Sequence, residues 1–185
     1  MWRYRLFRLA ATLVQAVPLW LSYACAWLGG LLAFWFAGGP RAALRANLRH
    51  VLGADAADAA IDRAVLGAFR TSAYNYIDMF RIPVVAPNTW RRLARRAARE
   101  RFLDTYAEGK GVIICTAHFG NFDLLVQVAS AHNVPVVALA ERLQPEALFE
   151  YVVALRAAHG LRILPIGASA LRDVLRTLRG GGVLA

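Results

Sequence analysis

Residues 111–140 read GVIICTAHFGNFDLLVQVASAHNVPVVALA, and this stretch decides the fold. An apolar run over 112–116 is followed by a short loop, a helical pattern over 121–131 and a second apolar run over 134–140. Short continuous apolar runs are typical of strands buried on both faces of a parallel sheet, and Asn121 suits the N-cap of the intervening helix. The stretch therefore predicts a strand–helix–strand unit.

The same alternation continues downstream. Pro145 is placed to open a helix that stops at Gly160, residues 161–165 resemble a third strand, Ser169 is placed to cap another helix, and a strand begins at 183–185. This order predicts an α/β fold with a mainly parallel sheet flanked by helices. The last predicted strand has only the three residues 183–185, whereas strands usually run about 5–6 residues. We therefore expect the sequence to be cut inside this α/β region.

Upstream, the pattern is helical and basic. We expect helices over 40–52, 56–80 and 101–108, and a short helix that starts at Asn88. That short helix carries a run of arginines: Arg91, Arg92, Arg95, Arg96 and Arg99. The run fits a solvated helix face, a contact with lipid phosphates or an acidic carrier, or a contact with nucleic acid.

The front of the chain is apolar, and no charged residue occurs from Leu9 to Pro40. This is longer than the ~20 residues of a membrane span, but Pro18 and the pair Gly29-Gly30 interrupt it. Arginines precede it at positions 3, 5 and 8 and follow it at 41, 45 and 49. A segment that dips into one leaflet or packs on the domain and a transmembrane helix both stay open, whereas a signal peptide has a shorter apolar region of ~7–15 residues.

Composition agrees with a protein at a lipid surface. The chain is 58% hydrophobic with a formal net charge of +10, and its mean hydropathy is +0.42. Apolar and basic residues together favour an anionic bilayer over nucleic acid as partner. Cys25 and Cys115 lie in apolar runs, where we expect them buried. The expected parts are an apolar membrane-associated segment over 1–40, a basic helical region over 41–100 and an incomplete α/β catalytic region over 101–185.

His118 and Asp123 are the candidate catalytic pair. Ligands bind beyond the carboxyl ends of strands in parallel α/β sheets, and His118 follows the first predicted strand. With a bend at Gly120 and a helix capped by Asn121, Asp123 can accept a hydrogen bond from one imidazole nitrogen and leave the other as a base. The alternative that His118 is only a polar loop residue and Asp123 only a partner of the helix dipole stays open. A metal site is disfavoured, because the sequence offers no third ligand beside these two residues.

A covalent intermediate is disfavoured because no G-x-S-x-G string occurs. In the simpler mechanism, His118 takes a proton from an acceptor hydroxyl, which attacks a thioester carbonyl directly. Backbone amides near Gly120 and Asn121, or an arginine, are candidate donors to the oxyanion.

The string AHFGNFDLL, residues 117–125, resembles the H-x4-D/E motif of the lysophospholipid acyltransferase superfamily. More narrowly, it resembles the bacterial branch of lipid A late acyltransferases and phosphatidylinositol mannoside acyltransferases. The resemblance implies that His118 is the base and Asp123 its partner. Asp instead of Glu leans toward the mannoside enzymes.

Further strings extend the resemblance: NLRHVLG at 47–53, AERLQP at 140–145 and RAAHG at 156–160. They imply that Arg142 and Arg156, together with Gly120 and Asn121, bind substrate. Arg156 also shares a mainly apolar helix face with Phe149 and Val153, where a bare structural role would be unusual.

The resemblance implies transfer of an acyl chain from acyl-CoA or acyl carrier protein to a hydroxyl of a membrane lipid or glycolipid. It places the protein at the cytoplasmic face of a bacterial inner membrane, with the bilayer as partner and without metal, further cofactor or nucleic acid. Two alternatives stay open: a non-enzymatic membrane-associated protein, and a thioesterase or lipid hydrolase that uses the same pair with water.

Overall fold

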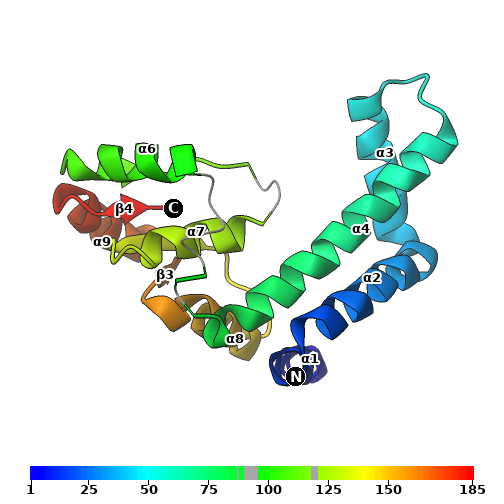
Figure 1. The fold of residues 1–185 in the computed structure, drawn as a ribbon, viewed down its shortest axis with the longest axis horizontal. Helices are drawn as coiled ribbons and strands as arrows, with labels where there is room; N and C mark the ends of the chain where they lie inside the picture. The colour runs from blue at the N-terminus through cyan, green and yellow to red at the C-terminus, as the bar shows by residue number, and fades with distance from the viewer. Residues whose placement is uncertain (87, 90–95, 118–120) are drawn as a thin grey trace. The chain divides into compact units, whose positions relative to one another are not determined.

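The computed structural model describes residues 1–86, 88–89, 96–117 and 121–185 (Figure 1). The α-helices are α1 Trp2–Ala16, α2 Leu19–Phe36, α3 Gly38–Leu52, α4 Asp58–Arg81, α6 Arg96–Ala107, α7 Phe122–Ser130, α8 Glu146–Arg156 and α9 Ala168–Arg179. The 3-10 helices η1 Ile82–Val84 and η2 Ala157–His159 follow α4 and α8. The strands are β1 Val112–Ile113, β2 Val136–Ala140, β3 Arg162–Pro165 and β4 Val183–Leu184.

The described chain forms two units. One, the α/β unit, comprises residues 1–15 and 79–185, and the other, the helical unit, comprises residues 16–78. The division into segments 1–40, 41–100 and 101–185 stays a prediction.

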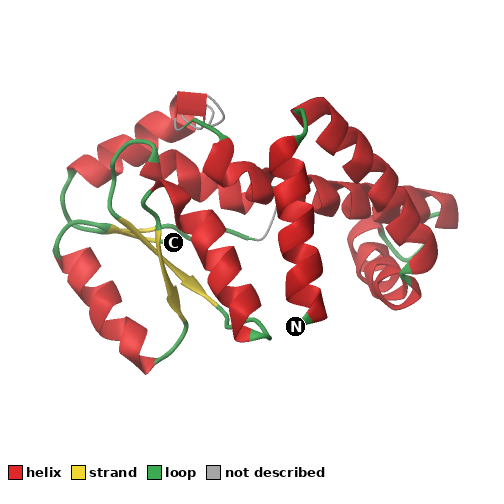
Figure 2. Cartoon of the chain, turned by 90° about the horizontal axis from the view of Figure 1, so that it is seen from below, coloured by secondary structure: helices red, strands yellow, loops and turns green. Residues whose placement is uncertain are grey.

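The sheet lies in the α/β unit and has the order β1-β4-β2-β3, with every pair parallel. The predicted parallel sheet is therefore confirmed, and helices lie along both sides of the strands in Figure 2. The short β4 is central: Val183 N donates to Pro135 O (2.9 Å) and Val112 N donates to Gly182 O (3.0 Å). Val183 is accordingly fully buried.

The first strand is shorter and more exposed than the sequence predicts. Only Val112–Ile113 is strand, and β1 pairs with β4 alone. Successive strand side chains alternate between faces: Val112 and Ile114 pack in the core, whereas Ile113 is 59% exposed and Cys115 also faces outward. Cys25 is exposed as well, because much of α2 lies at the surface, so the expectation of two buried cysteines was wrong.

Helices α6 and α7 cover the sheet through one apolar cluster. Its buried members are Ala129, Val134, Val136, Leu161 and Val183, and Phe102 and Tyr106 of α6 pack against them. α6 is one helix from Arg96, so the predicted break before residue 101 was wrong; residues 90–95 lie outside the described part. α9 begins at Ala168 with Gly167 as N-cap, which puts Ser169 inside the helix instead of at its cap.

The helix α1 belongs to the core of the α/β unit. Ala11 is fully buried in a cluster with side chains of α7, α8 and η1, and the Phe7 ring packs edge-on against Phe80, 4.8 Å between centroids. Tyr151 of α8 lies among the rings of Phe7 and Tyr4. Burial raises the pKa of the Tyr151 hydroxyl above its usual 10.0, partly offset by the nearby Arg8 charge.

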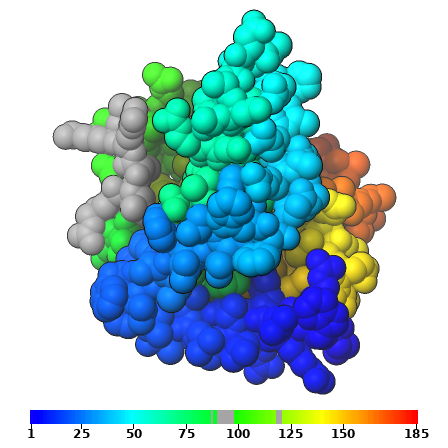
Figure 3. Space-filling model, turned by 90° about the vertical axis from the view of Figure 1, so that its right-hand side faces the viewer, coloured from blue at the N-terminus to red at the C-terminus, as the bar shows by residue number. Residues whose placement is uncertain are grey.

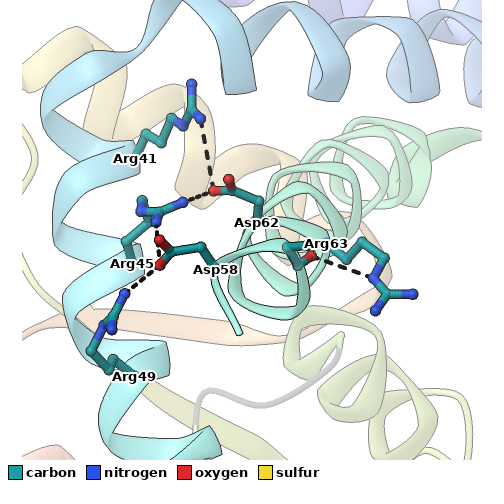
Figure 4. Close-up of polar contacts among 7 residues, drawn as sticks. Arg41, Arg45, Arg49, Asp58, Asp62 and Arg63 are labelled. Atoms are coloured by element: carbon teal, nitrogen blue, oxygen red, sulfur yellow. Dashed lines mark hydrogen bonds and ion pairs between the residues drawn. The ribbon is translucent and has the colours of Figure 1, made fainter. Parts of the chain in front are cut away.

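The helical unit packs α2 and α3 against α4. Its core is Phe34, Ile61 and Val65, and α2 approaches α4 so closely that a Cβ on Gly30 would lie 2.8 Å from Arg70 Cα. Arginines of α3 and aspartates of α4 form an ion-pair network (Figure 4), with Arg41, Arg45 and Arg49 around Asp58 and Asp62.

Within the described residues, α2 is the one helix whose length and apolarity match a membrane span, and 22% of that window is buried. Its exposed apolar side chains include Trp20, Trp27, Leu28, Leu32 and Trp35. The mid-blue helical surface in Figure 3 includes this part of the chain. Both membrane modes, a span and a leaflet-bound segment, therefore stay open for α2.

Candidate active site

The helix that follows β1 starts where the sequence predicts. Asn121 is the N-cap of α7, and its side chain accepts a hydrogen bond from Leu124 N at 3.2 Å. This cap fixes Asp123 in the first turn of α7, near the positive end of the helix dipole, which favours a carboxylate. Asp123 therefore lies in the first turn of the helix that follows β1, where the sequence predicts a site residue.

The guanidinium of Arg156 pairs with Asp123. Arg156 Nε lies 2.7 Å from Asp123 Oδ1, and Nη2 donates to Oδ2 at 3.1 Å. The Asp123 side chain is 13% exposed and that of Arg156 is 24% exposed. Of these two contacts, the one from Nη2 is a hydrogen bond, whereas Nε is an ion-pair contact without a hydrogen bond within the described residues. Partial burial limits screening of the pair by salt.

Packing of α8 explains why Arg156 reaches Asp123. Phe149, Val152 and Leu155 of α8 are buried, and Arg156 is the last residue of the helix. The sequence predicts Arg156 as a substrate-binding residue and does not predict that its partner is Asp123. This arginine does not stand alone as a cation, because Asp123 compensates its charge.

The other predicted site residues have different environments. Arg142 is 56% exposed, pairs with Glu146 at 2.7 Å and lies 5.9 Å from the centroid of the Phe149 ring. His118 and Gly120 lie outside the described residues. The roles proposed for all six residues, including Asn121 as a substrate contact, stay predictions.

One buried polar residue near the pair was missed. Gln127 lies one turn after Asp123 in α7 and is fully buried. Its signal in the sequence is a lone amide inside an otherwise apolar run, Leu124 to Ala129, at the i+4 position from Asp123, which places both side chains on one face of the helix.

The arrangement supports acid–base chemistry. A carboxylate oxygen has two lone pairs, so the contacts with Arg156 leave Asp123 able to accept a further hydrogen bond. Within residues 1–86, 88–89, 96–117 and 121–185, no three His, Cys, Asp or Glu side chains lie close enough to hold a metal ion.

Comparison with known protein families identifies the family of this chain. The chain belongs to the bacterial lipid A biosynthesis acyltransferase family, whose model matches residues 2–185. It is also similar to the phosphatidylinositol mannoside acyltransferase of Mycobacterium tuberculosis strain H37Rv, with 29% identity over 134 residues, 70% of this chain and 41% of the relative.

The corresponding protein of Mycolicibacterium smegmatis is 29% identical over 131 residues, 70% of this chain and 42% of that relative. The matched region thus spans about two fifths of these curated relatives. The predicted resemblance to the bacterial branch of lipid A and phosphatidylinositol mannoside acyltransferases is therefore confirmed.

Proposed function

We propose that this protein transfers a fatty acyl chain from an acyl thioester, acyl-CoA or acyl carrier protein, to a hydroxyl of a membrane lipid or glycolipid. The observation that carries the proposal is the carboxylate Asp123 of the H-x4-D string, which pairs with Arg156 in the first turn of the helix that follows β1. The named relatives act on a glycolipid, phosphatidylinositol mannoside, and this favours a glycolipid acceptor. The proposed location is the cytoplasmic face of the inner membrane.

In the proposed reaction, His118 is the general base. Its imidazole removes the proton from the acceptor hydroxyl while the hydroxyl oxygen attacks the thioester carbonyl. The tetrahedral oxyanion collapses to the new ester, the carbon–sulfur bond breaks, and the imidazolium returns its proton to the departing thiolate. General-base catalysis of this kind contributes typically ~10²–10⁴-fold.

Asp123 orients His118 and stabilises the imidazolium in this mechanism, as the carboxylate does in a catalytic triad. Arg156 acts through Asp123: its guanidinium holds both carboxylate oxygens at 2.7–3.1 Å. Oxyanion donors are proposed at the backbone amides of Gly120 and Asn121.

The test uses the intact protein in lipid vesicles with a radiolabelled acyl thioester, with and without a glycolipid acceptor. Label that enters the acceptor supports the transferase. Release of free fatty acid at the same rate with and without acceptor identifies a thioesterase. An absence of both products, with folded protein and both acyl donors tested, contradicts an enzymatic function.

A further inference from the structure

Helices α7 and α8 are joined by a row of polar contacts. On α7 the side chains involved are Asp123, Gln127 and Ser130, spaced i, i+4 and i+7, so that they lie on one face. Gln127 Nε2 donates to the backbone oxygen of Arg156 at 2.9 Å, and Ser130 Oγ donates to that of His159 at 2.9 Å. We call these contacts the α7–α8 seam.

Arg156 is held at both of its ends by this seam. Its guanidinium contacts Asp123, and its carbonyl accepts from Gln127, one turn further along the same helix. The chain continues from α8 directly into η2, whose N-cap is Arg156. Gln127 therefore ties the junction of these two helices to α7.

Gln127 carries a cost that simple capping does not explain. It is fully buried, and its Oε1 has no hydrogen-bond partner within the described part of the chain. A buried, unpaired polar atom costs on the order of 1–3 kcal/mol. Ser130 makes the equivalent contact, to the carbonyl of His159, through its hydroxyl. A serine has no amide oxygen that would be left unpaired, so capping alone does not require a glutamine.

We propose that Gln127 is a positioning residue, which fixes the backbone of Arg156 so that its guanidinium holds Asp123 in the orientation required for acyl transfer. The inference rests on the proposed function, because Asp123 must orient the base for the position of Arg156 to matter. Small displacements are costly in such a site: a misplacement of ~1 Å costs as much as 10²-fold in rate.

The principal test compares Gln127→Met with Ser130→Ala in the intact protein. Methionine is unbranched and flexible, so it can fill the space, but it removes the donor to Arg156. Ser130→Ala removes the neighbouring contact of the seam and leaves Arg156 untouched, which makes it the matched control. Both variants are expected to lower the melting temperature.

Only Gln127→Met is expected to lower kcat, about tenfold, with KM within twofold. The acidic limb of its pH–kcat profile should move to lower pH, because an imidazolium that loses its carboxylate partner is less favoured. Ser130→Ala should keep kcat within twofold and the same pH profile. Equal losses of kcat in the two variants would show that the seam matters only for folding.

A double-mutant cycle tests whether Gln127 acts through Arg156. In the Arg156→Ala background, Gln127→Met should change kcat by less than twofold. A full tenfold loss in that background overturns the proposal.

A measurement without turnover separates this inference from the proposed function. In protein labelled with ¹⁵N-arginine, the Arg156 Nε–H should exchange with water faster in Gln127→Met and at the wild-type rate in Ser130→Ala. If wild-type protein transfers no acyl chain, the proposed function fails. The exchange rate then still shows whether Gln127 holds Arg156 in place. An unchanged rate in Gln127→Met rejects the positioning role.

Discussion

Replacement of Arg156 by methionine should destabilise the α/β unit strongly. The Asp123 side chain is 13% exposed, so the variant leaves a carboxylate that is mostly buried and has lost its counter-charge. Breaking a fully buried pair in this way costs about 3–5 kcal/mol. Because some solvent reaches both partners, we expect on the order of 2–4 kcal/mol.

The size of the effect should depend on the charge left behind. In the double variant Asp123→Asn/Arg156→Met the carboxylate is gone, and at least half of the lost stability should return. The matched control is Arg142→Met, which breaks an exposed pair with Glu146 whose side chains are 56% and 48% exposed. Exposed pairs contribute about 0.2–1 kcal/mol, so this control should differ little from wild type.

The assay is thermal unfolding in detergent, followed by circular dichroism. For a chain of this size 1 kcal/mol corresponds to a shift of roughly 2–4 °C, so Arg156→Met should melt about 5–15 °C lower than wild type. If Arg156→Met matches Arg142→Met, or if the double variant is no more stable than Arg156→Met, the pair does not compensate a buried charge as described.

Two further predictions concern the helical unit. Leu28→Asp with Leu32→Asp places charges on exposed apolar positions of α2, at a cost of about 2.5–3.5 kcal/mol each in lipid. After sedimentation of membranes in high salt, the double variant should be in the supernatant, whereas wild type and the control Val51→Asp should be in the pellet. A double variant that still pellets contradicts membrane binding through α2. Gly30→Ala should lower the free energy of unfolding, measured in urea, by about 1–3 kcal/mol, because its Cβ would overlap the α4 backbone. Gly29→Ala has open space around its Cβ and should not have this cost. Equal effects of the two variants would contradict the close approach of α2 to α4.

Much of the fold follows from local signals in the sequence. Asn121 caps α7, Gly160 ends η2 in the left-handed conformation at φ 88°, and apolar runs give the strands. These features depend on neighbours in the chain, so a pattern can predict them. Strand order and edge exposure depend on distant partners, and for this reason the exposure of Ile113 was missed.

The site shows the same division between local and long-range information. The spacing of His118 and Asp123 is local, and the family resemblance assigns it a role. The pair of Asp123 with Arg156 spans 33 positions, and nothing in a single sequence specifies which carboxylate an arginine at a helix end will meet. The helix α1 is a similar case, because membrane association and packing on the domain were both open for the apolar front, and Ala11 packs in the α/β core.

The most direct test of the account is the turnover of His118→Ala in acyl transfer to lipid, beside His50→Ala, an exposed histidine of α3, as control. If His118 is the general base, the variant should lose ~10²–10⁴-fold in kcat while its melting temperature and circular dichroism match wild type, and His50→Ala should keep full turnover. A folded His118→Ala protein that retains more than about a tenth of wild-type turnover has lost less than tenfold, which is far short of the loss expected for a base. This result would contradict the proposed role of His118.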